Sequence, residues 1–231
     1  MYRLVVFDLD KTLCPLGKGI TDENLAMLRA LEKTGVRIAI CSGKPTYYLC
    51  GLMRQVGLER PVLVGENGAV IQFGVDLPPR EYEVLSYSQA AKDSIRLMRE
   101  TLERELPGMW YQPNVTGLTP FPRDEAEFAR LTACVERMRP QMKDVEIYLH
   151  CDCYDITPCV ITKASGLVRL GELLGISPEE TIAVGDGVND YPMFDYAGLA
   201  LGVNVEDETR VSRNFASTGE MLRGLLEMLR N

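Results

Sequence analysis

The sequence lacks the features that would assign it to several large classes of protein. No apolar run approaches the roughly 20 residues that a membrane-spanning helix needs, so we expect no membrane insertion. No charged leader with an apolar stretch precedes the first predicted strand, so we expect no secretory signal peptide. Basic residues are outnumbered, 25 Lys and Arg against 33 Asp and Glu, and the net charge of -8 argues against a nucleic-acid partner.

Cysteine occurs seven times, an odd number for a framework of paired disulfides. Together with the missing leader, this predicts reduced thiols and a cytoplasmic protein. The stretch His150-Cys151-Asp152-Cys153 offers a zinc site as an alternative. Residues 147–153 have the pattern of a strand, which would send His150 and Asp152 to one face and both cysteines to the other. We therefore do not expect these four side chains to bind one ion.

What the chain does contain is typical of a soluble globular protein. Its 231 residues are 46% apolar and 25% charged, enough for one large domain or two modest ones. The first apolar run, residues 4–7, predicts a strand buried on both faces, and it ends at Asp8 and Asp10. Two carboxylates that close repel by roughly 4 kcal/mol at an effective dielectric constant of 20. A solvated turn is one explanation of this pair, and a bound divalent cation is the other.

A second acidic cluster follows another short apolar run, residues 181–184. Its sequence is Gly185-Asp186-Gly187-Val188-Asn189-Asp190, in which glycines flank the first acid. Ligands of open α/β sheets bind where the carboxyl ends of parallel strands meet. If the two strands are neighbours in one sheet, Asp8, Asp10, Asp186 and Asp190 converge on one site of the size of a metal ion.

Four motifs in this order resemble those of the haloacid dehalogenase superfamily of aspartate-nucleophile phosphatases. They are Asp8-x-Asp10-x-Thr12, Ser42-Gly43, Lys163 and residues 185–190. The loop Glu66-Asn67-Gly68-Ala69 also resembles one that is common in the Cof-like branch of subclass IIB. The middle of the chain matches only in size and position.

The resemblance implies an α/β fold with a Rossmann-like parallel-sheet core and an inserted small α+β cap domain of the C2 type. We place the core in residues 1–81 and 157–231 and the cap in residues 82–156. Residues 70–86 alternate apolar and polar side chains and predict a hairpin that leaves the core. Within the cap we expect helices over 90–106 and 124–138 and strands over 109–116 and 145–153, with an antiparallel sheet.

The resemblance also implies roles for individual residues. Asp8 would be the nucleophile and Asp10 the general acid and base. Mg²⁺ would be held by Asp8, the backbone carbonyl of Asp10, Asp186 and Asp190. The phosphoryl group would contact Thr12, Ser42, Gly43 and Lys163, and the substrate would lie near Asn67 and Asn189. Lys11 stands where the family commonly has glycine and Lys44 where it has arginine, which leaves the roles of both lysines open.

These roles predict Mg²⁺-dependent hydrolysis of a small-molecule phosphate ester, such as a sugar phosphate or phosphoglycolate, by a monomer or homodimer. Cap residues that could contact the substrate are Tyr111, Gln112, Asn114, Thr116 and Arg123. Two alternatives stay open: a phosphomutase of the same fold, and a catalytically silent phosphate-binding regulatory protein. A receiver-type signalling domain also phosphorylates an aspartate, but the long insertion argues against it.

Overall fold

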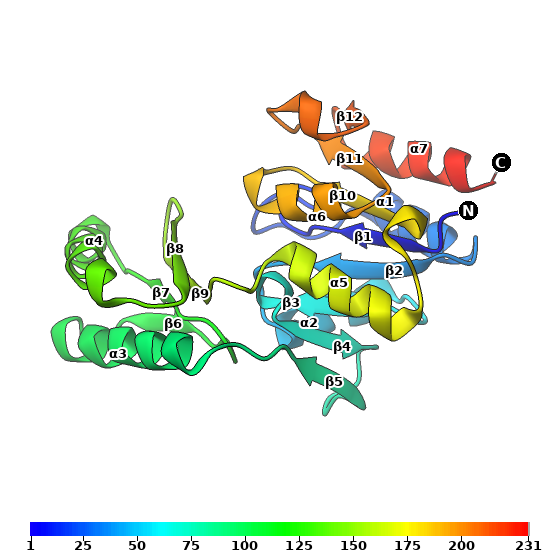
Figure 1. Cartoon of the computed structure of the whole chain (residues 1–231). Coiled ribbons are helices and arrows are strands. Elements are labelled where there is room, and N and C mark those ends of the chain that lie inside the picture. Colours follow the sequence, from blue (N-terminus) through cyan, green and yellow to red (C-terminus); the bar gives the residue numbers. More distant parts are fainter. Residues whose placement is uncertain (231) are drawn as a thin grey trace. The chain divides into compact units, whose positions relative to one another are not determined.

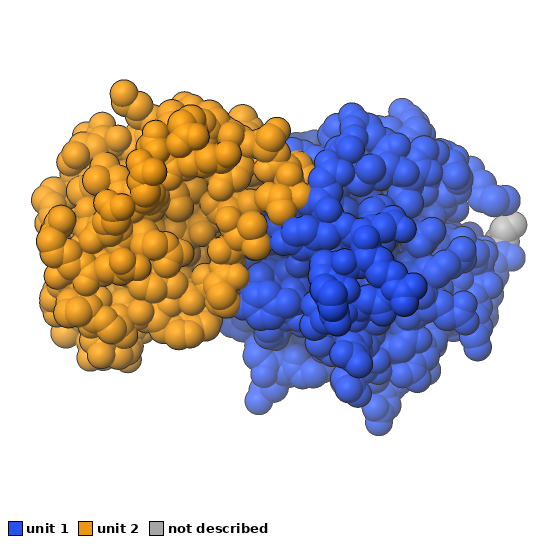
Figure 2. Space-filling model, turned by 90° about the horizontal axis from the view of Figure 1, so that it is seen from below, with its two compact units in different colours: residues 1–83, 162–231 blue, residues 84–161 orange. Residues whose placement is uncertain are grey.

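A computed structural model describes residues 1–230 (Figure 1). The chain forms two compact units, which Figure 2 shows in different colours. Unit 1 contains Met1–Glu83 and the chain from Thr162 onward, and unit 2 contains Val84–Ile161. Within the described residues, no helix combines the length and the apolar character that crossing a bilayer requires.

Unit 1 is built on one eight-stranded sheet with the order β12-β11-β10-β1-β2-β3-β4-β5. The strands from β12 to β3 run parallel, and β4 is antiparallel to β3. This is the α/β architecture with a parallel-sheet core that the sequence predicts. The strands are β1 Leu4–Phe7, β2 Arg37–Cys41, β3 Val62–Gly65, β4 Val70–Phe73, β5 Glu81–Val84, β10 Thr181–Gly185, β11 Leu199–Val203 and β12 Arg213–Phe215.

Helices cover both faces of this sheet (Figure 1). The helices α1, α2 and α7 bury leucine and methionine side chains against the odd-numbered residues of β1, such as Val5 and Phe7. The helices α5 and α6 pack together on the other face. Their bounds are α1 Asp22–Glu32, α2 Thr46–Val56, α5 Lys163–Leu174, α6 Tyr191–Tyr196 and α7 Thr218–Arg230, with short 3₁₀ turns η1 Glu66–Gly68, η3 Pro178–Glu180, η4 Val188–Asp190 and η5 Glu208–Arg210.

Local sequence explains where two of these helices begin and end. Thr21 caps α1 by accepting a hydrogen bond from the backbone N–H of Asn24, and acidic residues follow in the first turn, where the helix dipole favours them. Helix α5 begins after Thr162, whose side chain accepts from the N–H of Ser165. It ends at Gly175 in the left-handed conformation that favours glycine.

The hairpin of residues 70–86 is a correction to the sequence prediction. We expected it to leave the core, but β4 pairs with β3 and β5 forms the edge of the same sheet. Burial explains the difference, because Val70, Ile71 and Gln72 are buried in unit 1. An alternating pattern predicts a strand with two different faces, but it does not say which sheet that strand joins.

Unit 2 packs two helices on antiparallel strands, the α+β composition that the sequence predicts. The elements are α3 Gln89–Glu105, α4 Glu125–Met138, η2 Arg139–Gln141, β6 Trp110–Gln112, β7 Thr119–Phe121, β8 Val145–Leu149 and β9 Tyr154–Pro158. The pairs β6-β7 and β8-β9 are antiparallel, and a bridge between Leu118 and Ile156 joins them. Met98 of α3 and Leu131 of α4 share a buried cluster with these two residues. That unit 2 acts as a C2-type cap, with bounds at 82 and 156, stays a prediction.

The strand predicted over residues 145–153 is wrong in its second half. β8 ends at Leu149, and a turn follows in which the backbone N–H of His150 donates to the carbonyl of Cys153 at 2.9 Å. The chain then returns as β9. Residues 150–153 contain neither glycine nor proline, so the sequence carries no strong turn signal there.

Candidate active site

The acidic residues meet at one edge of the sheet because their strands are neighbours. β1 and β10 pair in parallel, with Phe7 opposite Val184, so the chain leaves both strands side by side. Asp8 follows β1 directly, and Asp186 follows β10. On the other side of β1, strand β2 ends just before Ser42. The carboxyl edge of three adjacent strands therefore carries the polar side chains that the sequence singled out.

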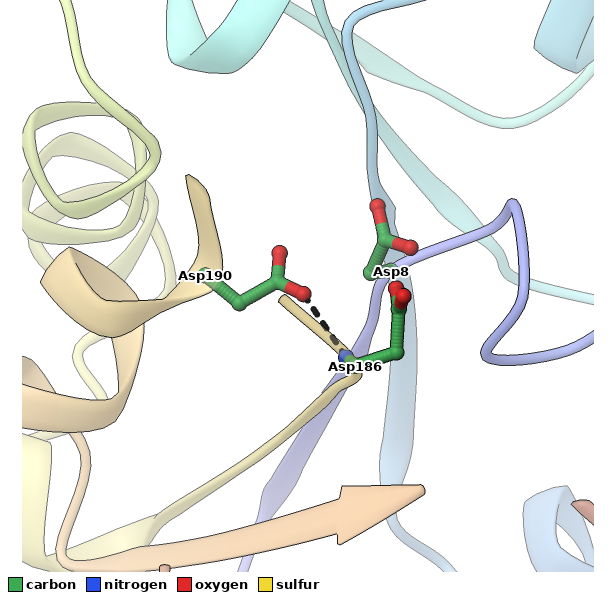
Figure 3. A group of neighbouring side chains, drawn as sticks. All are labelled: Asp8, Asp186 and Asp190. Carbon is green, nitrogen blue, oxygen red and sulfur yellow. Dashed lines mark hydrogen bonds between the residues drawn. The ribbon is translucent and has the colours of Figure 1, made fainter. Parts of the chain in front are cut away.

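Asp8, Asp186 and Asp190 form the acidic group of the site (Figure 3). Each offers a carboxylate oxygen, and these oxygens all lie within 4.8 Å of one another. The backbone N–H groups of Asp186 and Gly187 donate to Oδ2 of Asp190 at 2.8 and 3.1 Å. Closely spaced carboxylate oxygens are the ligands that hard divalent cations prefer, so the donor set fits Mg²⁺.

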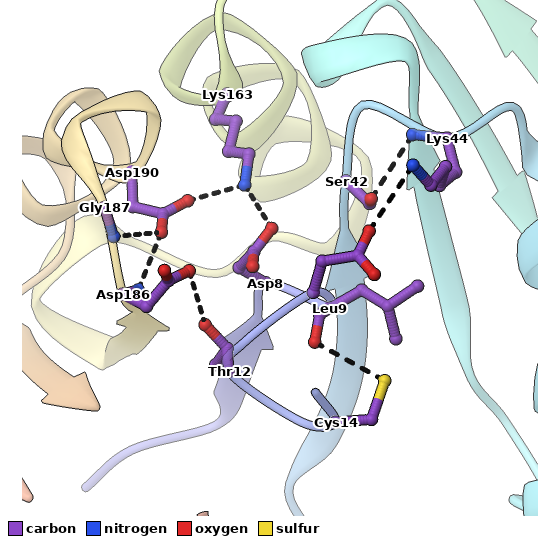
Figure 4. Close-up of polar contacts among 11 residues, drawn as sticks. Asp8, Leu9, Thr12, Cys14, Ser42, Lys44, Lys163, Asp186, Gly187 and Asp190 are labelled. Atoms are coloured by element: carbon purple, nitrogen blue, oxygen red, sulfur yellow. Dashed lines mark hydrogen bonds and ion pairs between the residues drawn. The ribbon is translucent and has the colours of Figure 1, made fainter. Parts of the chain in front are cut away.

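Lys163 is the cation at the centre of this group (Figure 4). Its Nζ lies 2.5 Å from Oδ1 of Asp8 and 2.5 Å from Oδ1 of Asp190. Its side chain is only 1% exposed, because the first residue of α5 points directly into the site. One ammonium group faces three carboxylates, and the cluster therefore keeps a negative charge that a metal ion could balance.

Burial and mutual charge shift the proton affinities in this cluster. Burial raises the pKa of Asp8 to about 7, because the attraction of Lys163 only partly offsets the loss of solvation and Asp190 adds repulsion. Burial and the charge of Asp190 also raise the pKa of Asp186. Burial disfavours the charged form of Lys163, but the carboxylates of Asp190 and Asp8 prevail and raise its pKa. Lys163 thus stays positively charged at neutral pH.

Thr12 and Ser42 are buried hydroxyl groups beside the acids. Thr12 Oγ1 donates to Oδ1 of Asp186 at 3.3 Å. Ser42 Oγ accepts from the backbone N–H of Lys44 at 3.3 Å, which fixes the turn that contains Gly43. Hydroxyl groups and exposed backbone N–H groups of this kind can donate to phosphoryl oxygens.

Asp10 lies outside the acidic group, although the sequence placed it there. Its carboxylate pairs with Lys44, whose Nζ lies 3.5 Å from Oδ2. The sequence left the role of Lys44 open, and this contact places the lysine beside the site. Lys11 adopts φ of +65°, which explains why a glycine would suit this position, and its side chain is exposed.

The two asparagines predicted near the substrate differ in their surroundings. Asn67 lies in η1 after β3, and its backbone N–H donates to the carbonyl of Ser42 at 3.0 Å. Asn189 is exposed in η4. The structure thus places Asn67 against the phosphate-binding candidates, and the roles of both asparagines stay predictions.

Two buried thiols near the site were not predicted from the sequence. Burial raises the pKa of Cys14 to about 11 and that of Cys41 to about 12, and neighbouring acids add to the first shift. Both thiols are therefore protonated at neutral pH and are poor nucleophiles. Asp8 is the better candidate for covalent chemistry at this edge of the sheet.

The family model of the haloacid dehalogenase-like hydrolases matches residues 5–116 and 123–212. The chain belongs to this family. The match is consistent with the Cof-type branch of the family and with subclass IIB. Because the matched residues contain every motif that carried the resemblance, the acidic edge of unit 1 is the place to look for the chemistry of this hydrolase.

Known proteins resemble the hydrolase along almost its whole length. The phosphoglycolate phosphatase of Methanopyrus kandleri is 26% identical and covers 98% of each chain. That of Haloarcula marismortui is 28% identical over 90% of this chain and 87% of its own. Two solved structures show the same fold. A haloacid dehalogenase-like hydrolase from Bacteroides thetaiotaomicron has a TM-score of 0.78 and 20% identity, with 100% of this chain and 99% of its own covered. The trehalose-6-phosphate phosphatase of Aspergillus fumigatus has a TM-score of 0.62 and 21% identity, with 100% of this chain and 93% of its own covered.

Proposed function

We propose that this hydrolase is a Mg²⁺-dependent phosphatase that hydrolyses a small phosphorylated metabolite through an aspartyl phosphate at Asp8. The observation that carries the proposal is the setting of Asp8. It is a buried carboxylate at the end of a central strand, in contact with Lys163 and within ligand distance of Asp186 and Asp190. Groups whose pKa is shifted by burial together with a specific charge partner cluster at functional sites.

The residues present fit a divalent cation. Asp8 and Asp186 would hold it with their carboxylates and Asp10 with its backbone carbonyl. Asp190 would contribute least, since its oxygens already accept from Lys163 and from two backbone N–H groups. When bound, the cation supplies Lewis acidity and neutralises negative charge on the phosphoryl oxygens. A chain with a net charge of -8 would otherwise repel a phosphate dianion.

The reaction needs two displacements at phosphorus. In the first, a carboxylate oxygen of Asp8 forms a bond to phosphorus while the bond to the ester oxygen breaks, and Asp10 gives a proton to the departing alkoxide. In the second, Asp10 takes a proton from water, the water oxygen bonds to phosphorus, and the bond to Asp8 breaks. The products are the alcohol and inorganic phosphate, and both carboxyl groups return to their first state.

Groups around Asp8 would hold the phosphoryl group during both steps. Lys163 donates charge-assisted hydrogen bonds, and the hydroxyl groups of Thr12 and Ser42 add neutral ones. The backbone at Gly43 adds a donor from the turn after β2. Asp190 positions Lys163 through the contact of 2.5 Å.

Phosphoglycolate-like acids and sugar phosphates are the substrates we propose. The names of the relatives from Methanopyrus kandleri and Haloarcula marismortui support the first class. Unit 2 would select among such esters, and the candidates for that role are Tyr111 of β6 and Arg123, just before α4. A cytoplasmic location and a monomeric or homodimeric state belong to the same proposal.

Hydrolysis of a generic aryl phosphate tests the mechanism. We expect wild-type protein to release inorganic phosphate in the presence of Mg²⁺ and to stop when EDTA is added. Asp8→Asn should lower kcat by at least about 10³-fold, because the amide cannot act as the nucleophile. Asp22→Asn, a substitution of an exposed acid in α1, is the matched control and should leave the rate unchanged.

Equal rates for wild type and Asp8→Asn would overturn the assignment of the nucleophile. The two alternatives have their own signatures in the same assay. A phosphomutase would need a sugar bisphosphate as activator and would not release phosphate steadily. A phosphate-binding regulatory protein would bind inorganic phosphate without turnover.

A further inference from the structure

The first turn of α5 touches the turn after β3 backbone to backbone. A Cβ atom placed on Gly166 would lie 2.6 Å from Cα and 2.8 Å from the carbonyl oxygen of Gly68, and 3.0 Å from a methyl group of Val64. Real Cβ atoms essentially never come closer than 3.0 Å to such atoms. The helix therefore reaches this position only because residue 166 has no side chain.

The partner of α5 in this contact is a turn with an unusual backbone. Glu66, Asn67 and Gly68 have φ of 52°, 55° and 106°, so three successive residues lie in the left-handed region. A Cβ on Gly68 would overlap the carbonyl oxygen of Thr162. Such a conformation persists only where the surrounding structure holds it, and such residues cluster at functional sites.

Hydrogen bonds connect the same turn to the loop that contains Ser42. The N–H of Asn67 donates to the carbonyl of Ser42 at 3.0 Å, and the N–H of Glu66 donates to the carbonyl of Lys44 at 3.1 Å. One turn therefore contacts the loop that contains Ser42 and the first turn of the helix that begins with Lys163, two of the phosphate-binding candidates.

Lys163 has little freedom to compensate for a shift of its helix. It is the first residue of α5, and the reciprocal hydrogen bonds of Thr162 and Ser165 fix the backbone around it. Its side chain is buried and reaches both Asp8 and Asp190 at 2.5 Å. A displacement of the first turn by a few tenths of an ångström or more would pass directly to Nζ.

We propose that Gly166 and Gly68 are positioning residues: their contact sets Lys163 relative to Ser42, so that both groups bind the same phosphoryl group. The proposal rests on the function proposed above for Lys163 and Ser42. Two contacts would then hold the start of α5 in place. One is the cap formed by Thr162 and Ser165, and the other is the contact of Gly166 with the turn that is hydrogen-bonded to Ser42.

Helix α5 offers a control for the simpler explanation that Gly166 only lets the fold pack. Gly171 lies in the same helix, and a Cβ there would lie 2.6 Å from the hydroxyl oxygen of Tyr196 and 2.8 Å from the carbonyl of Ile176. The overlap is similar, but it lies two turns away from Lys163. Gly51 in α2 has nothing within 4 Å of a Cβ and shows the effect of alanine without overlap.

The experiment compares Gly166→Ala, Gly171→Ala and Gly51→Ala in the full-length chain with Mg²⁺. Calorimetry measures the Kd for inorganic phosphate, aryl phosphate hydrolysis gives kcat and KM, and urea unfolding gives the folded fraction. For Gly166→Ala we expect about tenfold weaker phosphate binding and up to about 100-fold lower kcat/KM per folded molecule, since a misplacement near 1 Å has effects of that size. Gly171→Ala should unfold at a lower urea concentration than wild type but bind phosphate within twofold of the wild-type Kd. Gly51→Ala should also bind phosphate within twofold of the wild-type Kd, and it should lose no stability.

Wild-type phosphate affinity and kcat/KM in folded Gly166→Ala would overturn the positioning role. So would equal losses in Gly166→Ala and Gly171→Ala, because a distant overlap would then act as strongly. If Gly166→Ala does not fold, Ser165→Ala replaces it. This variant removes the two hydrogen bonds of the Ser165 hydroxyl with Thr162 and keeps the contact between the glycines, so it should bind phosphate within about threefold of wild type. A loss of tenfold or more would show that the cap alone places Lys163 and would overturn the role. Failure of the proposed function would be seen separately, as equal hydrolysis by wild type and Asp8→Asn.

Discussion

The two units each contain a cluster of polar side chains, and the clusters differ in their balance of charge. In unit 1, three carboxylates share one ammonium group, that of Lys163. In unit 2, a single carboxylate, Asp155, accepts from the hydroxyl group of Thr119 at 2.6 Å and lies 3.2 Å from Nε2 of His150. The first cluster has more negative charge than its one cation can balance, and the second places a hydroxyl donor and an imidazole beside a single carboxylate.

The hydrogen bonds of unit 2 continue beyond Asp155. Asn114 donates to Thr119 at 2.9 Å, and Gln112 donates to Asn114 at 2.8 Å. Donors and acceptors alternate along this chain, which is how buried polar groups stabilise a fold. An unbalanced cluster does the opposite, because buried charges without partners cost free energy. The difference supports the proposal that the first cluster serves binding and chemistry, and the second has the contacts of a cluster that stabilises its unit.

The largest expected effect comes from removing Lys163, the cation in contact with the acidic cluster of unit 1. Lys163→Met leaves Asp8 and Asp190 buried without their common partner. We expect the free energy of unfolding in EDTA to fall by roughly 3–5 kcal/mol and hydrolysis of aryl phosphate to be lost. Urea unfolding at pH 7 measures the first effect, with Lys18→Met, at an exposed lysine of the same unit, as control. A loss no larger than that of the control would show that the carboxylates of unit 1 do not need a cation.

The pH dependence of stability tests the surplus of negative charge. The pKa of Asp8 is about 7 in the folded chain, against an ordinary value of 3.8. Between these values the folded chain holds more protons than the unfolded one, so this carboxyl group makes the free energy of unfolding fall as pH rises, and the fall ends above pH 7. Without metal, Asp8→Asn should therefore exceed wild type in stability at pH 8 by up to about 4 kcal/mol.

The difference between Asp8→Asn and wild type should shrink at pH 5, where wild-type Asp8 is protonated. Urea unfolding in EDTA at both pH values gives the two differences, and the pH effects of groups remote from Asp8 cancel between the proteins. A difference that is the same at pH 5 and pH 8 would contradict the raised pKa of Asp8.

Unit 2 should respond in the opposite direction when its carboxylate is neutralised. Asp155→Asn removes the charge from the hydrogen bond with Thr119 and the contact with His150, and we expect a loss of roughly 1–2 kcal/mol in the free energy of unfolding. Hydrolysis of aryl phosphate should keep its kcat. Asp152→Asn, at an exposed residue of the β8-β9 turn, is the control. A more stable Asp155→Asn protein would mean that both clusters are unbalanced.

The sequence predicted the centre of the fold better than its edges. Strands β1 and β10 were predictable because both faces of each are buried and their residues are continuously apolar. The hairpin of β4 and β5 was placed outside the core, since pairing with β3 depends on tertiary contacts. The turn after Leu149 was missed because the apolar and polar residues alternate through it without a glycine or proline.

In the site, the residues that follow strands were easier to predict than the residue on a helix. The sequence was enough to predict that Asp8 and Asp186 lie close together, because acids that follow neighbouring parallel strands lie at the same edge of the sheet. The position of Lys163 depends on how α5 packs against the turn at Gly68, and no sequence pattern predicts that contact. The pairing of Asp10 with Lys44 also lay outside what spacing could predict, because Asp8 and Asp10 end up in different surroundings. The catalytic roles of all these residues stay predictions.

The smallest expected effect concerns this pairing at the rim of the cluster in unit 1. Lys44 and Asp10 are partly exposed, so Lys44→Met should change the free energy of unfolding by less than about 1 kcal/mol. If Lys44 orients Asp10 for proton transfer, its loss should lower kcat severalfold for an alkyl phosphate, whose leaving group needs a proton. An aryl phosphate has a better leaving group and should be affected less. The ratio of the two kcat values in wild type and Lys44→Met checks this, and an unchanged ratio would mean that the lysine adds only charge beside the carboxylates, without orienting Asp10.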